Sequence, residues 1–176
     1  MKKSTILTVL PLCVLTGFTL PYQWMKDIPA NLAVPKEDKL IFHAYAKGVQ
    51  IYQCVRDSAD TTRFSWTFVG PEATLYTNST CTHAVGKHYA GPTWETIGGS
   101  KVIGIKFQQA DSPDPGSIPW LLLKSGSNND KGIFAQVVYI QRIRTKGGKA
   151  PSTGADKAHK GVVIRVPYSA EYLFYK

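Results

Sequence analysis

Apolar and polar residues alternate over several short stretches of the chain, a pattern typical of strands. The clearest alternation is FSWTFV at residues 64–69, where three aromatic residues fall on one face. Residues 49–55 and 102–107 have the same two-residue period. The continuous apolar run at residues 120–123 indicates either a strand that is buried on both faces or a short turn in the core.

The C-terminal third contains the longest apolar stretch. Residues 132–145 predict a central strand that ends at Gly147-Gly148, and a last strand is expected within residues 161–168. The aromatic residues of 169–176 are expected to pack on the core. No segment keeps a helical period for three turns. The pattern therefore predicts an all-β protein, an antiparallel sandwich or barrel-like single domain with few or no helices.

The beginning of the chain has the layout of a targeting segment. Two lysines precede an uncharged apolar stretch at residues 4–20, which predicts a signal peptide over residues 1–20, with an uncleaved membrane anchor as the alternative. Prolines predict an extended lead-in over residues 21–39, followed by a single β-rich domain over residues 40–176. We expect an exported protein, periplasmic or extracellular, that contacts a membrane only through residues 4–20 if these stay attached.

Charge is spread unevenly over the chain. The formal net charge is +9, and from Arg142 onward eight Lys or Arg residues stand against only Asp156 and Glu171. A basic C-terminal third attracts anionic polymers. Acidic polysaccharide is therefore the expected kind of partner, in preference to nucleic acid, and the alternative is a basic surface that only aids solubility.

Three cysteines bear on the compartment and on metal binding. Cys13 lies in the predicted signal peptide, so an exported domain keeps Cys54 and Cys81. In an oxidising compartment this pair suggests one disulfide, with two free thiols as the alternative. Cys81, His83 and His88 lie close in sequence, but their spacing matches no zinc signature, so we expect no metal site.

Residues 88–94, HYAGPTW, form the segment that most resembles a ligand site. They gather His88, Tyr89 and Trp94 around a Gly-Pro turn, and a loop with an imidazole and two aromatic rings suits ligand binding. The alternative is a turn whose aromatic residues close one end of the fold. We expect Trp94 to be partly exposed and Trp66 to lie in the core.

Catalytic patterns are weak in this chain. The carboxylates nearest to the histidine segment are Glu72 and Glu95, so a small secreted hydrolase that uses His88 with Glu72 or Glu95 is the enzymatic alternative. No G-x-S-x-G motif is present. Neither G-x-G-x-x-G nor G-x-x-x-x-G-K-[ST] occurs, so we expect no nucleotide cofactor, and no other cofactor is indicated.

Six segments, in order along the chain, resemble the exported domain of unknown function 3455 family of bacteria and fungi. They are AKGVQIYQC (46–54), W-x-F-x-x-P-E-A-x-L-Y (66–76), HYAGPTW (88–94), IPWLLL (118–123), YIQRIRTKGGKAP (139–151) and VPYSAEYLFY (166–175). The resemblance implies an exported protein without an assigned activity. Our leading hypothesis is a non-enzymatic binding or surface protein of the cell envelope or extracellular space.

Two departures from the family pattern affect the candidate site. The resemblance implies an acidic residue where this chain has Gly98, so a catalytic role for that acid would leave this chain impaired. It also implies a cysteine where this chain has the small residues 152–155. On this comparison Cys54 has lost its usual partner, which leaves Cys81 as a substitute partner or both thiols free.

Overall fold

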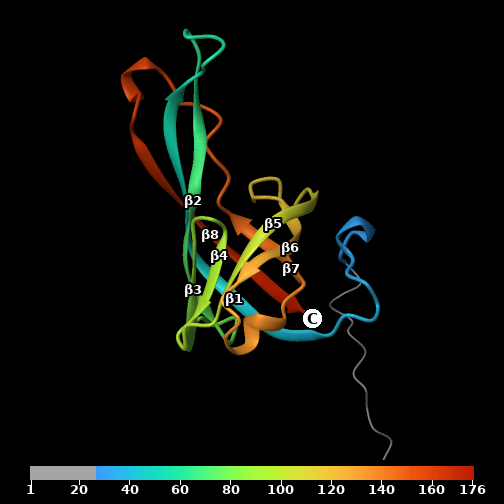
Figure 1. Cartoon of the computed structure of the whole chain (residues 1–176). Coiled ribbons are helices and arrows are strands. Elements are labelled where there is room, and N and C mark those ends of the chain that lie inside the picture. The colour runs from blue at the N-terminus through green and yellow to red at the C-terminus, as the bar shows by residue number, and fades with distance from the viewer. Residues whose placement is uncertain (1–26) are drawn as a thin grey trace, which may run out of the picture.

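The computed structural model describes residues 27–176, and within them the chain forms a closed antiparallel β-barrel (Figure 1). Each strand pairs with the next along the chain, and the last pairs with the first. The strands are β1 (Leu40–Arg56), β2 (Phe64–Tyr76), β3 (Ala84–Tyr89), β4 (Thr93–Thr96), β5 (Lys101–Ala110), β6 (Trp120–Asn128), β7 (Tyr139–Gly147) and β8 (Val163–Tyr175). The predicted all-β, barrel-like class is confirmed.

Unequal strand lengths shape the two ends of the barrel. The last part of β1, the first part of β2 and the start of β8 continue past the barrel as a projecting ribbon (Figure 1). Trp66 lies on this ribbon, half-buried, with its indole Nε1 donating to Thr153 O at 3.0 Å. The prediction that Trp66 lies in the core is wrong, because the strand that carries it extends beyond the barrel.

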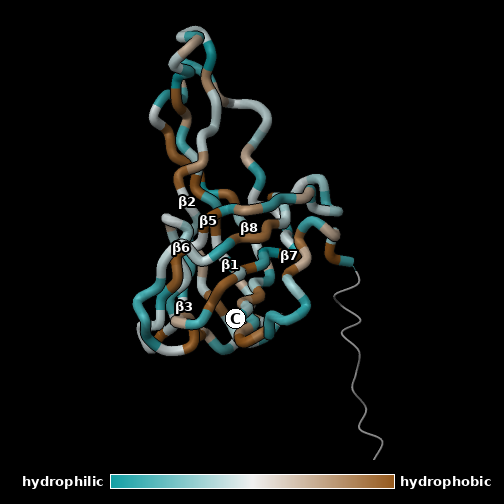
Figure 2. Tube along the Cα trace, turned by 45° about the vertical axis from the view of Figure 1, so that its right-hand side comes forward, coloured by the Kyte–Doolittle hydropathy of each residue, from teal (hydrophilic) through white to brown (hydrophobic). Residues whose placement is uncertain are grey.

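The barrel interior holds the larger of two hydrophobic clusters. Alanines of β1 and β2 share this cluster with large aromatic rings, so small and large side chains fill the interior together. Phe134 stacks on Phe174 with ring centroids 4.6 Å apart. Apolar and polar residues alternate along the strands in Figure 2, as expected for strands with one face toward the interior.

The second cluster lies outside the barrel, beneath the lead-in segment. Residues 27–39 are mostly extended and contain one short 3₁₀ turn, η2 (Ala30–Leu32). Leu32 is fully buried against outward side chains of the last three strands, and Gln141 Nε2 donates to Leu32 O at 2.6 Å. Trp120 and Leu122 pack here while Leu123 faces the interior, so residues 120–123 are buried on both faces.

The long strand predicted over residues 132–145 is wrong in its first half. Residues Gly132–Gln136 form a 3₁₀ turn, η3, and β7 begins only at Tyr139. Gly132 has φ +60, a conformation outside the strand region, and Phe134 N donates to Ser100 Oγ at 2.9 Å. This turn places Phe134 in the interior cluster.

The segment at the C-terminus agrees with its prediction more closely. β8 joins the strand expected within residues 161–168 to the aromatic segment 169–176, and Tyr172 and Phe174 pack in the interior.

The predicted signal peptide, its alternative as an anchor, and Cys13 lie outside the described residues. Among residues 27–176, no helix is long and apolar enough to span a membrane.

The two cysteines of the described chain are free in the structure. Cys54 is buried on the projecting ribbon, where it pairs with Trp66, and its Sγ lies 3.6 Å from Asp156 O. Cys81 lies in the loop after β2, at the opposite end of the barrel. The run of β1 between Tyr45 and Cys54 separates them, about 30 Å of strand. The suggested disulfide is therefore not formed, because the two thiols cannot meet across that length.

Candidate functional site

A cavity of about 180 Å³ lies inside the barrel, at the end from which the ribbon projects. Its lining combines aliphatic side chains such as Leu121 and Leu123 with a set of polar and aromatic ones. That set comprises Gln50, His88, Trp94, Lys106, Arg142 and Tyr172. Eight-stranded barrels have an interior just wide enough to be filled by side chains or to hold one small ligand.

The mouth of the cavity results from the short hairpin of β3 and β4. β3 ends at Tyr89, where the hairpin turns into β4. The neighbouring strands β2 and β5 are longer and both continue past this turn. Above the turn no strand separates β2 from β5. Phe68 and Val69 border this gap and are 52% and 54% exposed, and Lys106 faces them from β5. The cavity therefore reaches solvent between β2 and β5.

His88 lies in the wall of the cavity as a neutral imidazole. It is 2% exposed, and its Nδ1 lies 2.8 Å from Thr93 O, so Nδ1 carries the proton and donates. The ring stacks on Trp94 at a centroid distance of 4.4 Å, and Tyr172 meets it edge-on at 5.0 Å. Burial, with a smaller contribution from the Arg142 charge, lowers the pKa of His88 to about 3. Nε2 is left as a hydrogen-bond acceptor.

Several buried polar atoms around the cavity have no hydrogen-bond partner among the described residues. These are Gln50 Nε2, Trp94 Nε1, Tyr172 OH and the nearby Tyr168 OH. A buried polar group without a partner costs about 1–3 kcal/mol, so most such groups in folded proteins are satisfied. Burial raises the pKa of both tyrosines, which keeps their hydroxyl groups protonated. The cavity thus presents several polar groups, hydrogen-bond donors among them, that have no partner among the described residues.

Positive charge also faces the cavity. Arg142 projects inward from β7, and its Nε and Nη2 both donate to Pro119 O, at 3.1 and 2.8 Å. Lys106 lies at the mouth. The described cavity lining contains no Asp or Glu, and no described carboxylate forms an ion pair with Arg142.

The family that is described as Protein of unknown function (DUF3455) matches residues 35–176. The chain belongs to this family. No curated protein and no solved structure matches the chain. The match spans every strand of the DUF3455 barrel, so all residues that line the cavity fall within the family's region.

The DUF3455 chain brings together only part of the predicted ligand site. His88 and Trp94 stack inside the barrel, but Tyr89, next in sequence to His88, points outward and donates from its hydroxyl to Glu95 Oε2 at 2.7 Å. The expected loop is a strand-turn-strand hairpin, with residues 90–92 as the turn. Trp94 is 1% exposed, so its predicted partial exposure is wrong, because β4 directs it inward.

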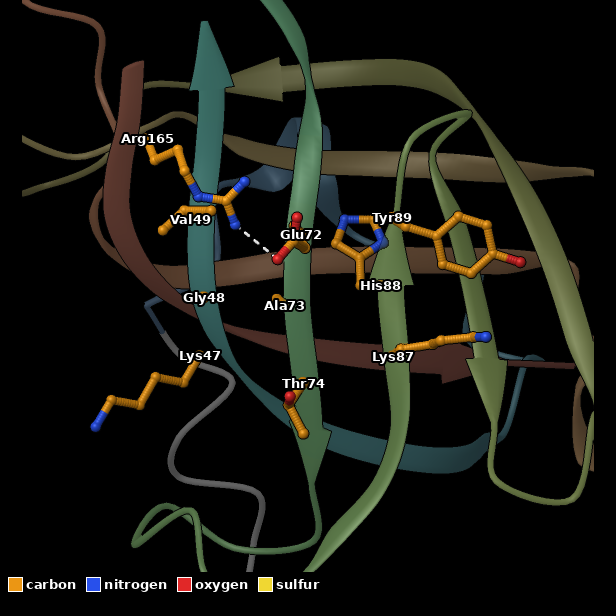
Figure 3. A pocket seen from close by; sticks show the side chains of 10 residues that line it. All are labelled: Lys47, Gly48, Val49, Glu72, Ala73, Thr74, Lys87, His88, Tyr89 and Arg165. Carbon is orange, nitrogen blue, oxygen red and sulfur yellow. Dashed lines mark hydrogen bonds and ion pairs between the residues drawn. The ribbon is translucent and has the colours of Figure 1, made fainter. Parts of the chain in front are cut away.

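Both predicted carboxylates lie on the outer surface. Glu72 accepts from Arg165 Nη2 at 2.6 Å across a shallow groove over β1, β2, β3 and β8 (Figure 3). Lys87 and Tyr89 extend together to one side of this groove (Figure 3). The Tyr89 hydrogen bond is the main cause of the lowered pKa of Glu95. His88 borders this outer groove together with Glu72, but its imidazole stacks on Trp94 inside the barrel. Neither Glu72 nor Glu95 lines the interior cavity.

Other residues that the sequence singled out lie away from the cavity of the DUF3455 barrel. Gly98 is part of the turn between β4 and β5 and does not line the cavity. His83 contacts Asn78 and Thr82 in the loop after β2. Between residues 27 and 176, no three His, Cys, Asp or Glu side chains lie close enough together to hold a metal ion.

Sequence reasoning missed four of the polar residues at the cavity: Gln50, Lys106, Arg142 and Tyr172. Each occupies an inward position of its strand, as Gln50 does between Ala46 and Tyr52 of β1. These four residues could have been found as polar residues on the buried face of a strand, since such positions are normally apolar. The sequence alone does not show which face of each strand is buried, so it could not identify them.

Proposed function

We propose that this protein is a non-catalytic binding protein that holds one small molecule inside its barrel. The observation that carries the proposal is the group of buried donors at the cavity, Gln50 Nε2, Trp94 Nε1 and Tyr172 OH, that have no partner among the described residues. A ligand with acceptor atoms would satisfy them and repay their desolvation. Leu121 and Leu123 supply the apolar contact that small-molecule sites usually combine with a few polar groups.

The size of the cavity restricts the ligand. An apolar protein cavity of about 150 Å³ is large enough to bind benzene. The 180 Å³ here therefore suits a molecule with one ring or a short chain, and excludes a dinucleotide or an oligosaccharide. The gap between β2 and β5 gives such a molecule a path from solvent.

A cavity-filling variant tests this function. Leu121→Trp is expected to occupy the cavity, so one-ring compounds that raise the melting temperature of the wild-type protein should no longer do so. The matched control is Ile105→Trp, because Ile105 is 61% exposed on the outward face of β5 and its replacement leaves the interior unchanged. Binding is measured by thermal shift and calorimetry with a panel of one-ring compounds, charged and neutral. Equal binding by wild type and Leu121→Trp would rule the cavity out as the site.

The hydrolase alternative finds no support in the geometry of the site. A general base needs a pKa near the working pH and a position next to the reacting group. His88 has a pKa of about 3, and its Nδ1 is held by Thr93 O. The two candidate carboxylates are engaged elsewhere, Glu72 with Arg165 and Glu95 with Tyr89. We therefore do not propose a hydrolytic role for His88 with Glu72 or Glu95.

We also propose that the protein acts outside the cytoplasm, at the cell envelope or in the extracellular space, with acidic polysaccharide as an additional partner. The support is the signal-like stretch at residues 4–20 and the basic C-terminal third. Within that third, Arg144 and Arg165 pair with Glu171 and Glu72, which reduces the charge free for a polymer. N-terminal sequencing of the exported protein and its retention on acidic polysaccharide in a salt series test both points. A cytosolic protein with residues 1–20 intact, or no retention at low salt, would contradict them.

A further inference from the structure

The cavity lining carries positive charge and no negative charge. This charge indicates which class of small molecule binds there, an inference that rests on the proposed function. Two cationic side chains, Arg142 and Lys106, face the cavity, and the described lining has no carboxylate. The partly buried guanidinium of Arg142 therefore carries a charge that no described acidic residue balances. Charges removed from water are costly unless they are paired, so a bound anion would stabilise this cavity.

The polar groups that surround Arg142 fit the same conclusion. Its Nε and Nη2 are held by Pro119 O, which fixes the plane of the guanidinium, and the guanidinium lies beside the Tyr172 hydroxyl. Gln50 Nε2 and Tyr172 OH are additional donors without acceptors at the same cavity. The Arg142 charge acts on both His88 and Tyr172, which places the guanidinium among these groups. A set of donors next to a cation matches the lone pairs of a carboxylate.

We propose that the cavity binds a small organic carboxylate, with its carboxylate at Arg142, Gln50 and Tyr172 and an apolar body of at most one ring. The apolar body lies against Leu121 and Leu123, beside the Trp94 indole. Lys106 at the mouth attracts the anion before it enters. A neutral ring of the same size would leave Arg142 unpaired, and an inorganic anion would leave the aliphatic walls without contact.

Benzoate and benzamide are the probes that test this class, because they share shape and size but differ in charge. Titration calorimetry on the full chain at pH 7.5 should show benzoate binding at least about tenfold more tightly than benzamide, as expected for a charge-assisted hydrogen bond to a partly buried arginine. Arg142→Gln should remove that preference by weakening benzoate at least about tenfold. Arg165→Gln is the matched control, since Arg165 lies on the outer groove with Glu72 and should leave benzoate affinity unchanged.

The outcomes separate the ligand class from the function. Benzamide binding as tightly as benzoate, or unchanged benzoate affinity in Arg142→Gln, would overturn the carboxylate while a binding cavity remained. Failure of both probes and of every other one-ring compound would remove the proposed function itself. If Arg142→Gln does not fold, the wild-type preference for benzoate and the variant Lys106→Gln, which should slow benzoate association, still decide the question.

Discussion

Replacing Gly48 with alanine will lower the free energy of unfolding by about 3 kcal/mol, at the upper end of the usual cost of overpacking. Gly48 pairs with Ala73 of β2 and with Tyr168 of β8. A Cβ at this position would overlap the backbone oxygen of Glu72 and lie 2.5 Å from Ala73 Cα. The neighbouring atoms are backbone, so they cannot give way as a flexible side chain would. Glycine is used here because the backbones of β1 and β2 approach closely.

Urea unfolding at pH 7.5 measures this effect, and Gly98→Ala provides the control. Gly98 lies in the turn between β4 and β5, and the nearest atom to an added Cβ is Thr96 Oγ1 at 3.9 Å. This substitution should change the free energy of unfolding by no more than about 0.5 kcal/mol. A Gly48→Ala protein as stable as wild type would show that β1 and β2 are not packed this closely.

Acidification from pH 7.5 to pH 5 should destabilise the wild-type protein by about 2 kcal/mol more than a His88→Phe variant. Burial lowers the pKa of His88 in the folded state from 6.5 to about 3. Between these values the unfolded chain takes up a proton that the folded chain excludes, so stability falls as the pH falls through 6.5. The value pH 5 lies about 1.5 units below the pKa of His88 in the unfolded chain. Each pH unit below that pKa lowers the free energy of unfolding by about 1.4 kcal/mol.

The comparison between the two proteins isolates His88. Phenylalanine keeps a ring beside Trp94 and cannot titrate, while the other histidines and the surface carboxylates contribute equally to both proteins. Stopping at pH 5 limits the contribution of Glu72 and Glu95, whose pKa values are lowered from 4.5. Urea unfolding midpoints at three pH values between 7.5 and 5 provide the measurement. Parallel stability curves for wild type and variant would show that the imidazole is accessible to protons in the folded state.

The candidate site could be predicted from sequence only where its residues are neighbours along the chain. The segment HYAGPTW groups His88 with Trp94, and the structure places these two side by side because they pair across a two-strand hairpin. The same segment also groups Tyr89 with them, but the structure separates it, since consecutive residues of a strand point to opposite faces. Arg142 and Tyr172 are distant from this segment in sequence, and only closure of the barrel brings them to His88.

The sequence by itself determined that this protein is built from strands and where most of them lie. A two-residue period and glycine or proline at the turns are local properties of the sequence. The local steric preferences of these residues are sufficient to specify strands and turns. The period also shows which residues share a face, as Ile103, Ile105 and Phe107 do on β5.

Only the tertiary structure decided which face is the interior. The apolar face of β5 points outward, with Ile105 61% exposed, while Lys106 points to the cavity on the opposite face. On the first part of β6 and on much of β7 both faces are buried, because residues 27–39 cover the outside. The burial of a strand depends on what packs against each of its faces. Here closure of the barrel and packing of the lead-in segment decide this, and both depend on contacts between residues far apart in the chain. The polar cavity follows from the same closure.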